Sequence, residues 1–216
     1  WPYLPFHRCS KKNERTYNGS RYTEFDVLDG QQRLITLFFI TAIVRDLTIK
    51  NDPNNSRLGG CKTIIYQKAA PDFGTPERLR IVFDIRDKVK NFIGIYIKED
   101  GGTEKCDSVT IEDIIKSYNK DISIKNMANA ILTIRNYFNN GKSIDKFFPY
   151  LMSNVLMISV SAEELEDAFH LFTVMNNRGL KLRNSDIIKA ENLAKIQVDD
   201  ERAKWATKWE NIEEFF

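Results

Sequence analysis

The sequence Asp29-Gly30-Gln31-Gln32-Arg33 lies between two apolar segments of different length. The first, residues 25–28, has the length of a strand, and the second, residues 34–49, is long enough for a helix of about four turns. A strand that ends in Asp-Gly and leads directly into a helix directs backbone N–H groups, and the positive end of the helix dipole, at one place. This junction therefore favours an anion.

The five residues of the junction carry the groups that a nucleotide or a phosphodiester requires. Gly30 lets the backbone approach closely, and Gln31 and Gln32 offer amide donors and acceptors. Arg33 can contact two phosphate oxygens at once, and Asp29 can hold Mg²⁺ or orient a water molecule. An alternative stays open, in which Asp29 only caps the helix, Gly30 only forms the turn and the other side chains are solvated.

A second polar segment lies far along the chain, around Gly179. Gly179 can end a helix in the left-handed conformation, with Asn176 and Arg178 beside it in the turn. Asp186 and Lys189 are three residues apart on the next expected helix, so their charges share one face. A plain helix stop followed by an ordinary surface ion pair also fits this pattern.

Composition places the chain among ordinary soluble globular proteins. Of its 216 residues, 42% are hydrophobic and 29% are charged, and 32 basic side chains nearly balance 30 acidic ones. This balance excludes the broad basic surface of a dedicated DNA-binding domain, so any nucleic-acid contact is local. The basic segment 8–21, expected as a mobile loop after a first strand, could touch DNA phosphates, although such loops are usually only solvated.

The cysteines and histidines exclude further kinds of site. The cysteines Cys9, Cys61 and Cys106 form no C-x-x-C pair, so neither a disulfide framework nor a zinc site is predicted. Free thiols and the lack of an apolar run of membrane-spanning length indicate a cytoplasmic protein. The two histidines, His7 and His170, are too few for a histidine-metal nuclease centre.

Periodicity predicts an α+β fold that is predominantly α-helical, with a small mixed β-sheet. The expected strands are 25–28, 63–67, 79–83 and a buried one at 155–160. The expected helices include an apolar stripe at 85–96, a helix opened by a Thr110–Asp113 capping box, a long helix through Phe138 and a helix from Ser143 that Pro149 interrupts. The chain begins without methionine and stops inside an expected helix, so we expect a piece of a longer protein.

Two polar motifs, in residues 27–37 and 176–189, together resemble the signatures of the GmrSD-type restriction endonuclease N-terminal domain, a family marked by its DGQQR motif. Trp209, Ile212 and Glu213 are similar to the W-x-x-I-E element that often follows these signatures. The resemblance implies a ParB/sulfiredoxin-like nucleotide-binding core with a helical extension. We therefore expect one domain over 1–216, with a mixed α/β nucleotide-binding core at 1–100 and a mainly helical part at 101–216 that completes the pocket.

The resemblance also implies a function and assigns roles to residues. Family members couple nucleoside triphosphate binding or hydrolysis to restriction of modified or foreign DNA in bacterial anti-phage systems. Their nuclease step commonly resides in an HNH-type domain, here outside this chain, in cis or in trans. The implied catalytic residues are Asp29, Gln31, Gln32 and Arg33, with Asp29 also holding Mg²⁺. The implied triphosphate-binding residues are Gly30, Asn176, Arg178, Gly179, Asp186 and Lys189.

A non-catalytic reading of the same pocket stays open. In it, the chain is a ParB-like module that binds nucleotide or DNA without turnover. Association with further copies of the chain is left open as well, and no membrane partner is expected. Turnover of a nucleoside triphosphate separates the two readings.

Overall fold

The computed structural model describes residues 6–17, 19–83 and 87–164, with isolated positions of the C-terminal part (167, 188, 192, 193, 195, 196, 201, 204–206, 208, 209 and 212). The described chain forms two compact units, one of residues 14–23 and 30–158 and the other of residues 7–13, 24–29 and 159 onward. Helices predominate over two small β-sheets in the described residues, which confirms the predicted α+β class. The predicted division near residue 100 stays a prediction.

A long β-hairpin precedes the DGQQR motif. Strands β1 (Phe6–Tyr17) and β2 (Ser20–Asp29) are separated by a two-residue connection, in which Gly19 has a φ of 79°. So short a connection joins antiparallel strands only. The predicted strand at 25–28 is confirmed, but the predicted mobile loop at 8–21 is wrong, because most of its polar residues belong to a strand pair with solvated positions.

β1 is the central strand of a three-stranded sheet with the order β2-β1-β5. Strand β5 (Met157–Ala162) confirms the strand predicted at 155–160. Each of its side chains is either half-buried or exposed, so the prediction that it is buried is wrong. An apolar run alone does not show whether a second layer covers a strand.

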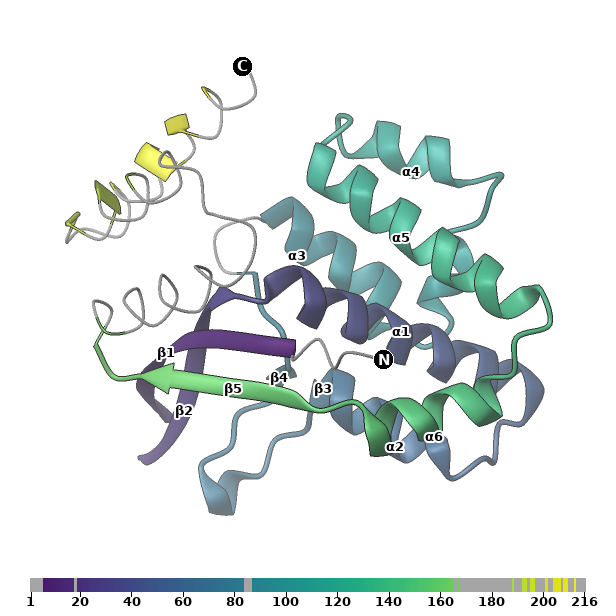
Figure 1. Cartoon of the computed structure of the whole chain (residues 1–216), viewed down its shortest axis with the longest axis horizontal. Helices are drawn as coiled ribbons and strands as arrows, with labels where there is room; N and C mark the ends of the chain where they lie inside the picture. The colour runs from purple at the N-terminus through teal and green to yellow at the C-terminus, as the bar shows by residue number, and fades with distance from the viewer. Residues whose placement is uncertain are drawn as a thin grey trace. The chain divides into compact units, whose positions relative to one another are not determined.

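Helix α1 (Gln31–Asn51) forms the centre of the hydrophobic core of the first unit. It confirms the helix predicted at 34–49, and it packs against α2 (Arg57–Ile65) and α5 (Ile122–Asn139) (Figure 1). Its fully buried side chains include Phe39, Ile43 and Val44. Among the described residues, none of the helices combines the length and apolar character that crossing a bilayer requires.

The predicted strands at 63–67 and 79–83 are only partly right. Residues up to Ile65 belong to α2, which buries Cys61 and Ile65 at helical spacing. The remaining strand residues form a two-residue antiparallel pair, β3 (Tyr66–Gln67) with β4 (Arg78–Leu79). Residues 63–65 are β-branched and favour a strand locally, but packing of α2 against α1 overrides that preference.

The predicted helix at 85–96 is present as α3 (Asp87–Ile93), which continues into a π-helical turn at Gly94–Lys98. Val89, Phe92 and Ile97 along this stretch are buried in the core. A 3-10 helix at Gly102–Lys105 follows. A Cβ atom at Gly102 would lie 2.6 Å from the Ile95 carbonyl oxygen, so only glycine fits there.

Helix α4 (Ile111–Ser117) begins where it was predicted but not by the predicted capping box. Thr110 occupies the N-cap, and its side chain makes no capping hydrogen bond. The Asp107 carboxylate instead accepts hydrogen bonds from the backbone N–H of Val109 at 2.8 Å and of Thr110 at 2.9 Å. These bonds to the charged form lower the pKa of Asp107, with the Thr110 N–H contributing most.

Helix α6 (Ile144–Asn154) passes through Pro149, so the predicted interruption there is wrong. Proline removes only the hydrogen bond to the carbonyl of Asp145, which lies in the exposed first turn. The apolar face of α6 still buries Phe148 and Leu151. Packing of that face therefore outweighs the single missing bond.

The connection between α4 and α5 holds two residues in an unfavourable conformation. Asn119 and Lys120 both have a φ of 57°, although each carries a Cβ atom. We expect Lys120→Gly to stabilise the fold by about 1 kcal/mol, because glycine adopts this conformation without the steric penalty. Chemical denaturation measures the change.

Lys125→Gly is the matched control, since Lys125 is equally exposed but lies within α5. Glycine inside a helix destabilises by about 1 kcal/mol, so the two substitutions should have opposite signs. Equal destabilisation by both would show that residue 120 carries no strain.

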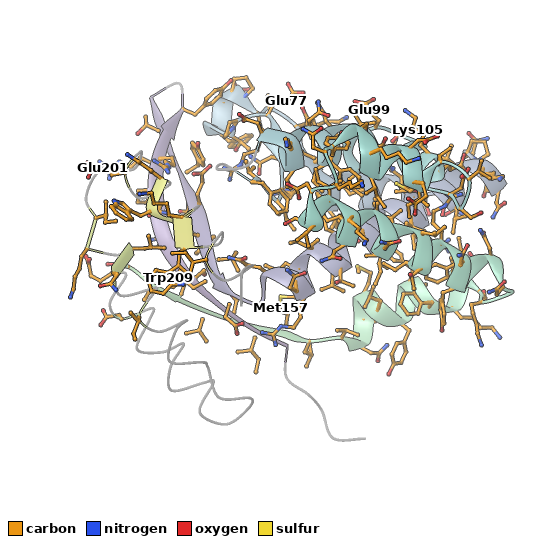
Figure 2. The ribbon with its side chains drawn as sticks, turned by 90° about the horizontal axis from the view of Figure 1, so that it is seen from above. Glu77, Glu99, Lys105, Met157, Glu201 and Trp209 are labelled. Carbon is orange, nitrogen blue, oxygen red and sulfur yellow. The ribbon has the colours of Figure 1, made fainter. Side chains whose placement is uncertain are left out.

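A buried arginine on α1 binds the turn that follows the π-helical segment. Arg45 is only 1% exposed. Its Nε donates to the Asp46 carboxylate at 2.7 Å, while Nη1 and Nη2 donate to the carbonyls of Lys98 at 3.1 Å and Glu99 at 2.6 Å. Figure 2 labels Glu99 and Lys105 near the two ends of the segment that this arginine and its neighbours hold.

Asp46 completes the network from the same helix. Its side chain is 1% exposed, and the carboxylate accepts hydrogen bonds from the backbone N–H groups of Gly101 and Thr103, both at 2.9 Å. The hydroxyl of Thr103 donates to it as well, at 2.6 Å. From α5, Arg135 Nη1 lies 2.9–3.0 Å from the carbonyl oxygens of residues 103, 104 and 106. Side chains of two helices thus fix the backbone of residues 98–106.

Candidate functional site

The strand-to-helix junction is formed by a single left-handed glycine. β2 ends at Asp29, Gly30 has φ 83° and ψ 9°, and α1 begins at Gln31. The Gly30 carbonyl accepts the first helical hydrogen bond from the N–H of Leu34 at 3.0 Å. A side chain at position 30 would cost roughly 1–2 kcal/mol in this conformation, so the sharp turn requires glycine. The backbone thus passes from strand to helix within one residue.

The N-cap position of α1 carries no side chain that could cap the helix. The N-cap residue is Gly30, not Asp29, and the first turn contains no acidic residue. The alternative in which Asp29 serves as the helix N-cap is therefore not what the structure shows. No acid of the first turn neutralises the positive end of the α1 dipole. The start of α1 consequently keeps its preference for an anion.

The polar side chains of the motif differ in exposure. Gln31 and Gln32 are exposed at the first two positions of α1, so their amides can meet a ligand from solvent. Asp29 and Arg33 are half-buried, and both already make contacts within the fold. Partial burial strengthens the interaction of these charges with an incoming ion. The motif thus combines two accessible amides with two charged groups that the fold restrains.

The second predicted segment cannot be placed beside the first. Asn176, Arg178, Gly179, Asp186 and Lys189 all lie outside the described residues. Their convergence with the DGQQR motif stays a prediction.

The rest of the described chain offers little other chemistry of this kind. No three His, Cys, Asp or Glu side chains of the described residues gather closely enough to hold a metal ion. Burial raises the pKa of the Cys61 thiol to about 11 and that of Cys106 to about 12, so neither is a thiolate at neutral pH. The donors at the junction suit a magnesium ion that arrives bound to phosphate, because such an ion takes one or two carboxylates from the protein.

A surface hollow of about 260 Å³ lies between α1, α5 and α6. It is lined by Ile40, Thr133, Ile134, Tyr137, Phe138 and Phe147. Two of these residues, Thr133 and Tyr137, carry a hydroxyl, and that of Thr133 already donates to the Asn129 carbonyl at 2.8 Å. Walls that are otherwise apolar favour an apolar group over a phosphate, so the hollow is no rival to the junction.

Comparison of the sequence with known protein families shows which family this chain matches. Residues 6–193 match the family described as the GmrSD restriction endonuclease, N-terminal domain. The chain belongs to this family. The match includes the DGQQR motif and the segment 176–189 of this GmrSD N-terminal domain, which confirms the predicted resemblance. No curated protein matches the chain.

Proposed function

We propose that this GmrSD N-terminal domain binds and hydrolyses a nucleoside triphosphate as the regulatory part of a modification-dependent restriction system that acts against phage. Hydrolysis would license attack on modified or foreign DNA by an HNH-type nuclease domain outside this chain. The observation that carries the proposal is the start of α1 directly after Asp29, with the left-handed Gly30 as its N-cap and no acidic residue in its first turn, in a chain of this family. A ParB/sulfiredoxin-like core is part of the same proposal.

Each junction residue has a different role in phosphoryl transfer. The N–H groups at the start of α1 and the amides of Gln31 and Gln32 hold phosphate oxygens. Arg33 neutralises charge that develops on the transferred phosphoryl group, and Asp29 orients the attacking water. Such a reaction needs positioning and charge neutralisation but no covalent nucleophile from the protein.

Magnesium fits this arrangement as a companion of the triphosphate. Asp29 is the carboxylate that would hold it, and when bound the ion neutralises phosphate charge. The segment with Asn176, Arg178, Gly179, Asp186 and Lys189 would bind the triphosphate from its other side. These assignments rest on the family's motif order and on the chemistry of the residue types.

Phosphate release by the purified chain tests the proposal. Each of the four ribonucleoside triphosphates is supplied with Mg²⁺, and binding is measured in parallel by calorimetry. We expect Mg²⁺-dependent release of phosphate with at least one of them. Tight binding without turnover would favour the non-catalytic ParB-like module, and failure to bind any triphosphate would leave only a role in assembly.

A further inference from the structure

Ser10 on β1 carries a buried hydroxyl that no described residue satisfies. Its exposed fraction is 0%, and its Oγ atom has no hydrogen-bond partner. Other buried hydroxyls of the described chain are paired: Thr41 donates to the Leu37 carbonyl at 2.8 Å, and Thr103 donates to Asp46 at 2.6 Å. Because an unpaired buried hydroxyl is costly, such a group in a folded protein calls for an explanation.

The hairpin register shows which residues share a face with Ser10. A two-residue connection pairs Tyr17 with Ser20 and, counting back from there, Glu14 with Thr23. The hydrogen bond from the Thr23 hydroxyl to the Glu14 carboxylate at 3.3 Å agrees with this pairing. The same count places Ser10 opposite residue 27.

Asp29 is therefore the diagonal neighbour of Ser10 on the same face of the hairpin, since side chains two residues apart on a strand point the same way. An equivalent diagonal is already bridged on the opposite face, where Asn13 Nδ2 donates to Asp26 Oδ2 at 2.7 Å. Serine is one bond shorter than asparagine. A rotamer of Asp29 that turns towards β1 would bring its carboxylate within reach of the Ser10 hydroxyl.

We propose that Ser10 is a positioning residue that donates a hydrogen bond to the Asp29 carboxylate in the nucleotide-bound state. The inference rests on the proposed function of the junction. One carboxylate oxygen of Asp29 would accept the Ser10 hydroxyl, which would leave the other oxygen available to hold a phosphate-bound magnesium ion or to orient a water molecule. Ser10 itself needs no access to solvent, because it acts on Asp29 and not on the ligand. Leaving this hydroxyl unpaired destabilises the nucleotide-free state, but it keeps a hydrogen-bond donor available for Asp29 when nucleotide binds.

A double-mutant cycle tests the pair. Calorimetry measures the affinity of the best triphosphate with Mg²⁺ for the wild type, Ser10→Ala, Asp29→Asn and the double variant. We expect Ser10→Ala to weaken binding about tenfold, as the loss of one hydrogen bond to a charged group does. We expect the double variant to bind no more weakly than Asp29→Asn alone. The Tm of Ser10→Ala should be unchanged or raised, since an unpaired buried hydroxyl has been removed.

Thr23→Val is the matched control, because it removes an exposed hydroxyl from the same hairpin. It should change neither affinity nor Tm. Where Asp29→Asn binds too weakly to measure, the Mg²⁺ concentration that supports half-maximal binding replaces the cycle. That concentration should rise about tenfold in Ser10→Ala.

Wild-type affinity in Ser10→Ala would overturn the inference, as would an effect that multiplies with that of Asp29→Asn. A lowered Tm with unchanged affinity would assign Ser10 to packing alone. The proposed function fails in a different way, visible in the wild type without any variant. If the wild type binds no triphosphate, both proposals fall together.

Discussion

Asp29→Ala and Arg33→Ala are each expected to lower the rate of nucleotide turnover by about 100-fold or more, to an undetectable level, while leaving the fold intact. Asp29 ends β2 and Arg33 lies in the first turn of α1, so both charges act at the junction where phosphate would bind. Neither residue is fully buried, and neither belongs to the buried hydrophobic core. Phosphate release measures turnover, and circular dichroism with a melting curve checks the fold.

Two controls remove like charges from the same elements. Asp26→Ala truncates a carboxylate of β2 that is exposed and bonded to Asn13. Lys50→Ala removes a cation from the opposite end of α1, where the side chain is 69% exposed. Both controls should turn over nucleotide at the wild-type rate. Unchanged hydrolysis in both Asp29→Ala and Arg33→Ala would refute the assignment of the junction.

The backbone of the junction could be predicted because its determinants are local. A strand, a glycine that tolerates positive φ and a long apolar helix are each encoded within a few residues of one another. The exposure of Gln31 and the half-burial of Asp29 depend on neighbours from elsewhere in the chain. Ser10 could not be predicted, because it stands in a polar segment that resembles a loop until the hairpin register is known.

Helices were predicted correctly where an apolar pattern runs over several turns, and the errors arose where the pattern is short. The apolar stretch of α1 is too long for a strand, and the buried positions of α5 repeat at helical spacing, so both could be identified as helices. Residues 63–65 and Pro149 illustrate the errors, since a local preference pointed away from helix and tertiary packing prevailed. The basic hairpin was missed because charged residues on a solvated strand have the composition of a loop.

The polar network of Arg45 and Asp46 shows a further limit of local reasoning. Two adjacent charged residues inside an apolar helix give no sign of their partners. Those partners, the backbone of Glu99 and Thr103, lie more than fifty positions away in sequence. Only the folded chain shows that this pair determines the conformation of residues 98–106.

Asp46→Ala is expected to destabilise the fold by about 3–5 kcal/mol and to lower Tm by roughly 10 °C. The substitution leaves the buried Arg45 guanidinium with only the half-exposed Asp100 carboxylate, 3.4 Å away, and it removes the acceptor of two backbone N–H groups and the Thr103 hydroxyl. Asp46→Asn keeps the shape and one acceptor oxygen, so its effect should be smaller. Chemical denaturation gives the free energies of unfolding.

Asp145→Ala separates the effect of burial from that of ion pairing. The Arg57–Asp145 pair has the same N···O distance as the Arg45–Asp46 pair, 2.7 Å, but Asp145 is 75% exposed where Asp46 is 1% exposed. Solvent screens the exposed pair, so its loss should cost under about 1 kcal/mol. Equal losses in the two variants would mean that the charge attraction alone, and not the buried hydrogen bonds to residues 98–106, accounts for the stability that Asp46 contributes.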